Sequence, residues 1–77
     1  MVWKKISHLP IEFNDQLFWV TLEYSYQGEV NRYTDLARFS SAWEEIYQGR
    51  LLENEHTRVV AWQPLLEKPP KFYKGKV

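Results

Sequence analysis

The sequence predicts a mainly β protein, a small single domain over residues 1–77 built on an antiparallel sheet of about four to five strands. Alternation of apolar and polar residues over 17–26, followed at once by Gln27-Gly28, is the main observation behind this prediction. The second is the aromatic content, four Trp, five Tyr and four Phe in 77 residues. A chain this short buries little surface, and each aromatic ring supplies about 150–250 Å² of it.

The first strand is predicted over 17–26, because its even positions are all apolar or aromatic: Phe18, Val20, Leu22, Tyr24 and Tyr26. Gln27-Gly28 then predicts a tight turn, since glycine tolerates positive φ. The return strand is expected over 30–39. Period two places Tyr33, Ala37 and Phe39 on one face of it, and Arg32, Thr34 and Arg38 on the other.

Residues 40–52 allow two interpretations. Ser41 and Glu44 fit a capping box, and the helical spacing of the residues after it suggests one short helix near 41–48. Gln48-Gly49, which separates EEIY from RLLE, instead indicates a hairpin or irregular strand pair, and we prefer this interpretation. A final buried strand is predicted over 57–65, with Pro64 ending its hydrogen bonding on one side.

The two ends of the chain have different characters. Pro10 disfavours helix before it, so residues 3–10 should be extended, and a turn is expected over 14–16. Residues 68–77 hold four lysines and no acid. We expect this basic C-terminal tail to be solvated, with Pro69 and Pro70 sending the chain away from the sheet.

Charge and composition exclude several classes of protein. Ten Lys and Arg balance ten Asp and Glu, which argues against a domain-wide basic surface. There is no cysteine, so disulfides and thiolate metal sites are excluded. The chain shows neither an apolar run long enough for a membrane span nor a signal peptide, so we expect a cytoplasmic protein without membrane contact.

No catalytic, metal or cofactor site is expected, and we predict that the protein is not an enzyme. His8 and His56 are both flanked by loop signals, without further ligands at zinc-binding spacing. The close carboxylate pairs, Glu44-Glu45 and Glu53 with Glu55, have no neighbours in the sequence that would tune them for acid–base work.

Binding residues are easier to nominate. A sheet that carries aromatic and arginine side chains can stack nucleic-acid bases, and a lysine-rich tail can contact phosphates or an acidic partner. Tyrosines on strands are also common cross-strand packing residues, which is the simpler interpretation. The candidates are Tyr24, Tyr26, Arg32, Tyr33 and Arg38 in the hairpin, and Lys71, Tyr73 and Lys74 in the tail.

Three stretches, WKKISHLP, YTDLARFSSAWEEI and VVAWQPLLEKPP, together resemble a phage- and prophage-associated domain family of unknown function. That family opens with Trp and Leu-Pro and closes with Trp-Met-Pro-Leu-Pro-Glu-Pro-Pro, and some members lie C-terminally in early-region proteins of lambda-like phages. Gln63 stands here where Met is common, and Leu66 and Lys68 replace prolines. The resemblance implies a small antiparallel β domain with Trp3, Pro10, Trp43, Trp62 and Pro64 as structural positions.

The expected function follows from this resemblance and from the missing catalytic residues. We expect a non-enzymatic phage accessory protein that binds a host protein or protein complex in the cytoplasm of an infected or lysogenic bacterium. Inhibition of a host defence system, as by an anti-CRISPR protein, is one concrete form. The alternative is a nucleic-acid-binding module using the aromatic and arginine hairpin with the basic tail. A homodimer, formed through an exposed strand edge, is a further expectation.

Overall fold

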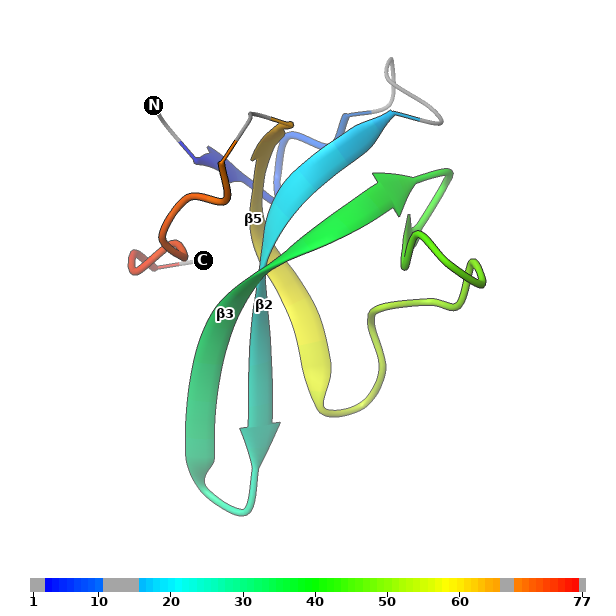
Figure 1. Ribbon diagram of the computed structural model, residues 1–77. Coiled ribbons are helices and arrows are strands. Elements are labelled where there is room, and N and C mark those ends of the chain that lie inside the picture. The colour runs from blue at the N-terminus through cyan, green and yellow to red at the C-terminus, as the bar shows by residue number, and fades with distance from the viewer. Residues whose placement is uncertain (1–2, 11–15, 66–67, 77) are drawn as a thin grey trace.

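Five antiparallel strands form a single sheet, in the order β1-β5-β2-β3-β4, that curls into a half-barrel (Figure 1). The computed structural model describes residues 3–10, 16–65 and 68–76. Its strands are β1 (Lys4–Lys5), β2 (Leu17–Tyr26), β3 (Glu29–Phe39), β4 (Trp43–Glu44) and β5 (Thr57–Pro64). The predicted mainly β class is confirmed. The described residues contain no helix long and apolar enough to cross a membrane.

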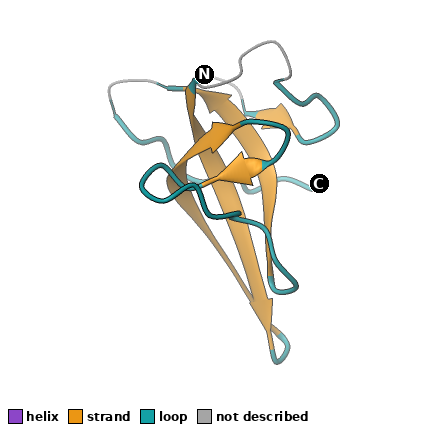
Figure 2. Ribbon diagram, turned by 90° about the vertical axis from the view of Figure 1, so that its right-hand side faces the viewer, coloured by secondary structure: helices purple, strands orange, loops and turns teal. Residues whose placement is uncertain are grey.

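The longest strands, β2 and β3, form a hairpin whose turn projects beyond the other elements (Figure 2). Tyr26 pairs with Glu29, and between them Gln27 and Gly28 have φ values of 50° and 84°. Two successive residues with positive φ match the right-handed twist of the strands that they join. The predicted turn is therefore confirmed.

One face of the sheet, called here the core face, holds the apolar core. Phe18 packs edge-to-face on Trp43 and on Trp62, with ring centroids 5.8 and 5.3 Å apart. The even-numbered residues of β2 are buried, as predicted, only as far as Leu22. Beyond it the core layer ends, because β4 and the aromatic rings packed with it lie at the other end of the sheet. The buried cluster comprises Phe18, Val20, Leu22, Ala37, Phe39, Trp43, Val59 and Trp62.

The segment between β3 and β5 is a strand pair with turns. A bridge joins Glu44 to Leu51, and the Glu45 amide donates to the Arg50 carbonyl at 2.9 Å. Gly49 at φ 70° turns the chain between them. The preferred hairpin interpretation is confirmed, and the short helix considered near 41–48 does not form.

The opposite face, called here the second face, is crossed by residues 70–76, the C-terminal segment. The Thr34 hydroxyl donates to the Pro70 carbonyl at 2.8 Å, and the Tyr73 amide donates to the Thr21 hydroxyl at 2.7 Å. Trp3 Nε1 adds a bond to the Lys71 carbonyl at 3.0 Å. The expectation of a tail sent away from the sheet is wrong, because polar side chains of the second face bind its backbone.

The N-terminal residues border β5. β1 pairs with β5 through Lys4 and Trp62, and Trp62 Nε1 donates to the His8 carbonyl at 2.7 Å. A turn at 6–7 interrupts the extended stretch expected over 3–10, and the turn expected over 14–16 lies mostly outside the described residues. Of the five motif positions, Pro10, Trp43 and Trp62 are buried, Trp3 is half-buried, and Pro64 is exposed at the end of β5.

Candidate interaction surface

Four exposed or half-buried rings gather where the core face continues beyond Leu22. They are Tyr24, Tyr26, Tyr33 and His56, called here the tyrosine surface. Tyr24 and Tyr26 stack at a centroid distance of 6.4 Å, and the His56 ring meets Tyr26 edge-on at 5.1 Å. Tyr33 lies on β3 directly opposite Leu22, so it is the diagonal neighbour of Tyr24 on the same face. Three of the four rings, Tyr24, Tyr26 and His56, thus contact one another in the free protein.

The tyrosines remain open to solvent. Tyr24, Tyr26 and Tyr33 are 39, 47 and 45% exposed, whereas Leu22, the neighbouring residue on the same face, is 1% exposed. Tyr24 and Tyr26 keep this much surface while they stack on each other, and Tyr33 adds a third exposed ring to the same face. A surface of this kind is typical of an interface, since tyrosine provides contact area with few torsions to order.

Carboxylates border the tyrosine surface. Asp35 is the next residue on the core face of β3, and burial together with its negative charge raises the pKa of the Tyr33 phenol. Glu29 lies opposite Tyr26, and Glu55 Oε1 lies 3.3 Å from His56 Nε2. The core-face positions of β2 and β3 carry no Lys or Arg at all. The surface is therefore aromatic and acidic.

The second face instead carries an ion-pair cluster around the buried carboxylate of Glu23. Glu23 lies opposite Arg32 on β3 and Arg58 on β5. Its carboxylate accepts Arg32 Nε and Nη2 at 2.9 and 2.8 Å, and Arg58 Nη2 at 2.9 Å. Burial alone would raise the pKa of Glu23, but the hydrogen bonds and charges of the two arginines outweigh it and lower the pKa below its ordinary value. Arg32 Nη1 also donates to the carbonyls of Tyr73 and Gly75.

The structure separates the nominated residues into two groups. Tyr24, Tyr26 and Tyr33 come together on the core face. The others lie on the second face or in the segment that crosses it: Arg32, Arg38, Lys71, Tyr73 and Lys74. Because neighbouring residues of a strand point to opposite faces, no arginine of the hairpin stands beside a tyrosine of the tyrosine surface.

Arg32 and Arg38 are both half-buried, and Arg32 is committed to the fold. Tyr73 is half-buried with its ring 5.7 Å from the Arg32 guanidinium, whereas Lys71 and Lys74 are exposed. The lysines of the segment therefore keep their charges in solvent, but on the face away from the tyrosine surface.

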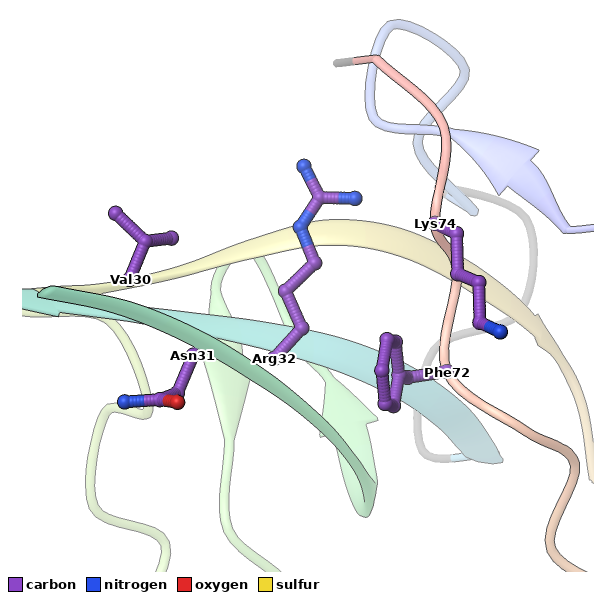
Figure 3. A pocket seen from close by; sticks show the side chains of 5 residues that line it. All are labelled: Val30, Asn31, Arg32, Phe72 and Lys74. Atoms are coloured by element: carbon purple, nitrogen blue, oxygen red, sulfur yellow. The ribbon is translucent and has the colours of Figure 1, made fainter.

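A shallow pocket of about 480 Å³ lies between β3 and the C-terminal segment (Figure 3). Val30 and Arg32 project from one side of β3 and Asn31 from the other, while Phe72 and Lys74 come from the segment. Arg32 already donates to Glu23 and to two carbonyls, and the Lys74 ammonium lies 5.9 Å from the Phe72 ring. The pocket offers no set of convergent groups for catalysis. Within the described part of the chain no three His, Asp or Glu side chains cluster closely enough for a metal ion.

Sequence reasoning missed three residues of these two clusters. His56 was placed among loop histidines, although it packs on the tyrosines, and Glu23 and Arg58 were not nominated. The position of Glu23 opposite Arg32 follows from the register of the predicted hairpin, so a signal for that pair existed. Arg58 and His56 contact their partners because β2 pairs with β5, and no local sequence pattern predicts that pairing.

No protein-family model, curated protein or solved structure matches this chain. The resemblance to the phage domain family therefore stays a prediction from the sequence. A functional proposal must rest on the two faces of the sheet described above.

Proposed function

We propose that this protein works by binding another protein at the tyrosine surface, without chemistry of its own. The observation that carries the proposal is the stacked pair Tyr24 and Tyr26 at the end of the core face, with Tyr33 on the same face and all three rings more than one-third exposed. Exposed aromatic residues that contact one another supply the buried anchors of protein interfaces. Their place on the projecting hairpin leaves room for a large partner (Figures 1 and 2).

The geometry favours a protein over a nucleic acid as the partner. Base-stacking surfaces combine aromatic rings with cations that follow the phosphate backbone. Here Asp35 and Glu29 border the rings, and the nearest arginine of the hairpin, Arg32, points to the other face and is bound to Glu23. The nucleic-acid alternative would have to use the lysines of the C-terminal segment without the tyrosines.

Capture experiments with tagged protein test the proposal. We expect wild-type protein to retain a specific protein from bacterial lysate, and the Tyr24→Ser/Tyr26→Ser variant to lose it. Tyr47→Ser is the matched control, because Tyr47 is 88% exposed but lies in the turn after β4. Retention of the same proteins by all three would contradict the proposal. Nucleic acid shifted equally by wild type and the double variant at low salt would assign binding to the lysines instead.

The wider role, a phage accessory protein that inhibits a bacterial defence system, is proposed on the sequence resemblance alone. Expression in bacteria that carry a phage-targeting CRISPR system gives a direct readout. We expect plating of the targeted phage to rise with wild type and not with Tyr24→Ser/Tyr26→Ser. Unchanged plating across a panel of defence systems would count against this role while leaving the tyrosine surface to the capture experiment.

A further inference from the structure

We infer that the partner contributes an extended segment rich in Lys or Arg, which adds as a strand along the open edge of β3 and lays its cations on the tyrosine surface. This inference rests on the proposed function, that the tyrosine surface binds a protein. It names the chemistry of the bound segment and the backbone to which it pairs.

The backbone groups of Val30, Arg32 and Thr34 on β3 point away from β2. The Ser25 amide donates to the His56 carbonyl at 2.8 Å, so the Ser25 backbone faces β5. Val30 lies opposite Ser25 in the antiparallel ladder, and the two form a non-hydrogen-bonded pair. In such a pair the backbone N–H and C=O groups of each residue point away from the other strand. The backbone groups of Val30 therefore face outward, and those of Arg32 and Thr34 follow with the same parity.

This edge of β3 is open between Val30 and Thr34. β4 pairs with β3 only at Arg38 and Phe39. The Leu36 amide is taken by Asp35 Oδ1 at 2.8 Å, and the turn after β4 lies beside Asp35 and Leu36. From Val30 to Thr34 the outward backbone groups have no hydrogen-bond partner within residues 3–10, 16–65 and 68–76. Unpaired groups in a strand of this length are a template for an added strand.

An added strand would meet negative charge on the core face. Every other side chain of such a strand would lie on the core face, beside Asn31 and Tyr33, where Asp35 and Glu29 are the neighbouring charged groups. Lysine or arginine at these positions would gain both from the carboxylates and from the tyrosine rings. The intervening side chains would face Val30, Arg32 and Thr34 on the second face, where Phe72 and the cation Lys74 also line the pocket. The cations of the segment therefore belong on the core face, with uncharged residues such as Thr at the intervening positions.

A second copy of this chain fits the edge less well. A two-fold interface matches a surface with itself. The core-face row of β3 contains two acids, Glu29 and Asp35, and no base, so two copies would bring acidic rows together. A partner of opposite charge removes this repulsion.

Capped heptapeptides serve as probes: alternating Lys and Thr, alternating Glu and Thr, and the Lys–Thr peptide with proline at its central Thr. We expect the Lys–Thr peptide to bind at least tenfold more tightly than the Glu–Thr peptide, and more weakly as salt increases. Its binding should shift the NMR signals of the Val30, Arg32 and Thr34 amides. The proline peptide should bind several-fold more weakly, since it loses a ladder bond.

Two matched variants test the protein side. Asp35→Asn keeps an oxygen that can accept the Leu36 amide, and it should lower the affinity for the Lys–Thr peptide about two- to fivefold. Glu44→Gln removes the same charge at the position opposite Arg38, on the second face, and should leave binding unchanged. Equal binding of the acidic peptide, or amide shifts confined to residues outside 30–34, would overturn the inference.

Failure of the inference and failure of the proposed function give different results. If the captured protein is lost by Tyr24→Ser/Tyr26→Ser but fully retained by Asp35→Asn, and the Lys–Thr peptide does not bind, the tyrosine surface stands and the basic strand is refuted. Sedimentation provides the remaining test. A wild-type dimer that becomes monomeric in Val30→Pro, but not in Val30→Ala, would assign the edge to a second copy and overturn the inference.

Discussion

Glu23 and Arg32 face each other across β2 and β3, with Arg32 Nη2 2.8 Å from Glu23 Oε2. The same guanidinium donates through Nη1 to the carbonyls of Tyr73 and Gly75, at 2.9 and 2.7 Å. One buried carboxylate therefore orients the arginine that holds the end of the C-terminal segment on the sheet. The second face around Glu23 is therefore covered by the C-terminal segment, whereas the core face beyond Leu22 is open to solvent.

Replacing Glu23 should destabilise the protein. Glu23→Gln leaves Arg32, with a side chain only 17% exposed, without its counter-charge, and hydrogen bonds to charged groups contribute roughly 1.5–3 kcal/mol. We expect the free energy of unfolding, measured with urea at neutral pH, to fall by about 2 kcal/mol. Glu44→Gln should change it by less than about 0.5 kcal/mol. Equal stability of wild type and Glu23→Gln would show that the cluster contributes nothing.

The same carboxylate predicts an acid-sensitive stability. The arginines hold the folded-state pKa of Glu23 below its ordinary value of 4.5. A lowered pKa stabilises the fold above the unfolded pKa, and the contribution disappears as pH falls through the folded value. Urea midpoints of wild type and Glu23→Gln should therefore begin to converge as pH falls below about 4.5, and should meet only below the folded-state pKa of Glu23. A difference that grows on acidification would contradict the prediction.

Thr21 provides a test of the docked C-terminal segment. Thr21 is fully buried, and its hydroxyl accepts the Tyr73 amide at 2.7 Å. Thr21→Val preserves the shape but leaves this amide without a partner, so we expect a loss of about 1 kcal/mol. Hydrogen exchange of the Tyr73 amide should accelerate in Thr21→Val and not in Thr57→Val. Unchanged exchange at Tyr73 would argue that the segment is held by its other contacts.

The hairpin turn should respond to substitution at both of its central residues. Gly28 has φ 84°, a conformation that costs an L-residue roughly 1–2 kcal/mol, so Gly28→Ala should lower the free energy of unfolding by about 1 kcal/mol. Gln27 has φ 50°, where asparagine is preferred, so Gln27→Asn should be neutral or stabilising. Thermal unfolding of both variants measures the difference, and a stabilising Gly28→Ala would contradict the turn geometry.

Much of the fold could be predicted from the sequence, because its signals are local. The alternation over 17–26 gave the first long strand with its bounds, and Gln27-Gly28 gave the turn. The register of the hairpin follows from these two features. The prediction for the C-terminal segment was wrong because its partners, Thr21 and Thr34, lie more than 30 residues away along the chain. The composition of the segment shows its positive charge, but it does not show which face of the sheet binds its backbone.

Which side chains share a face of the sheet follows from the local sequence, since side chains alternate between the two faces once the strands form. What covers each face depends on contacts between segments that are distant in the sequence. Phe18 and Leu22 are buried while Tyr24 and Tyr26 stay open, because the layer packed on the core face ends between them. Glu23 on the other face is buried beneath a segment from the far end of the chain. Burial depends on these long-range contacts, and it is burial that separates the structural cluster from the surface proposed for binding.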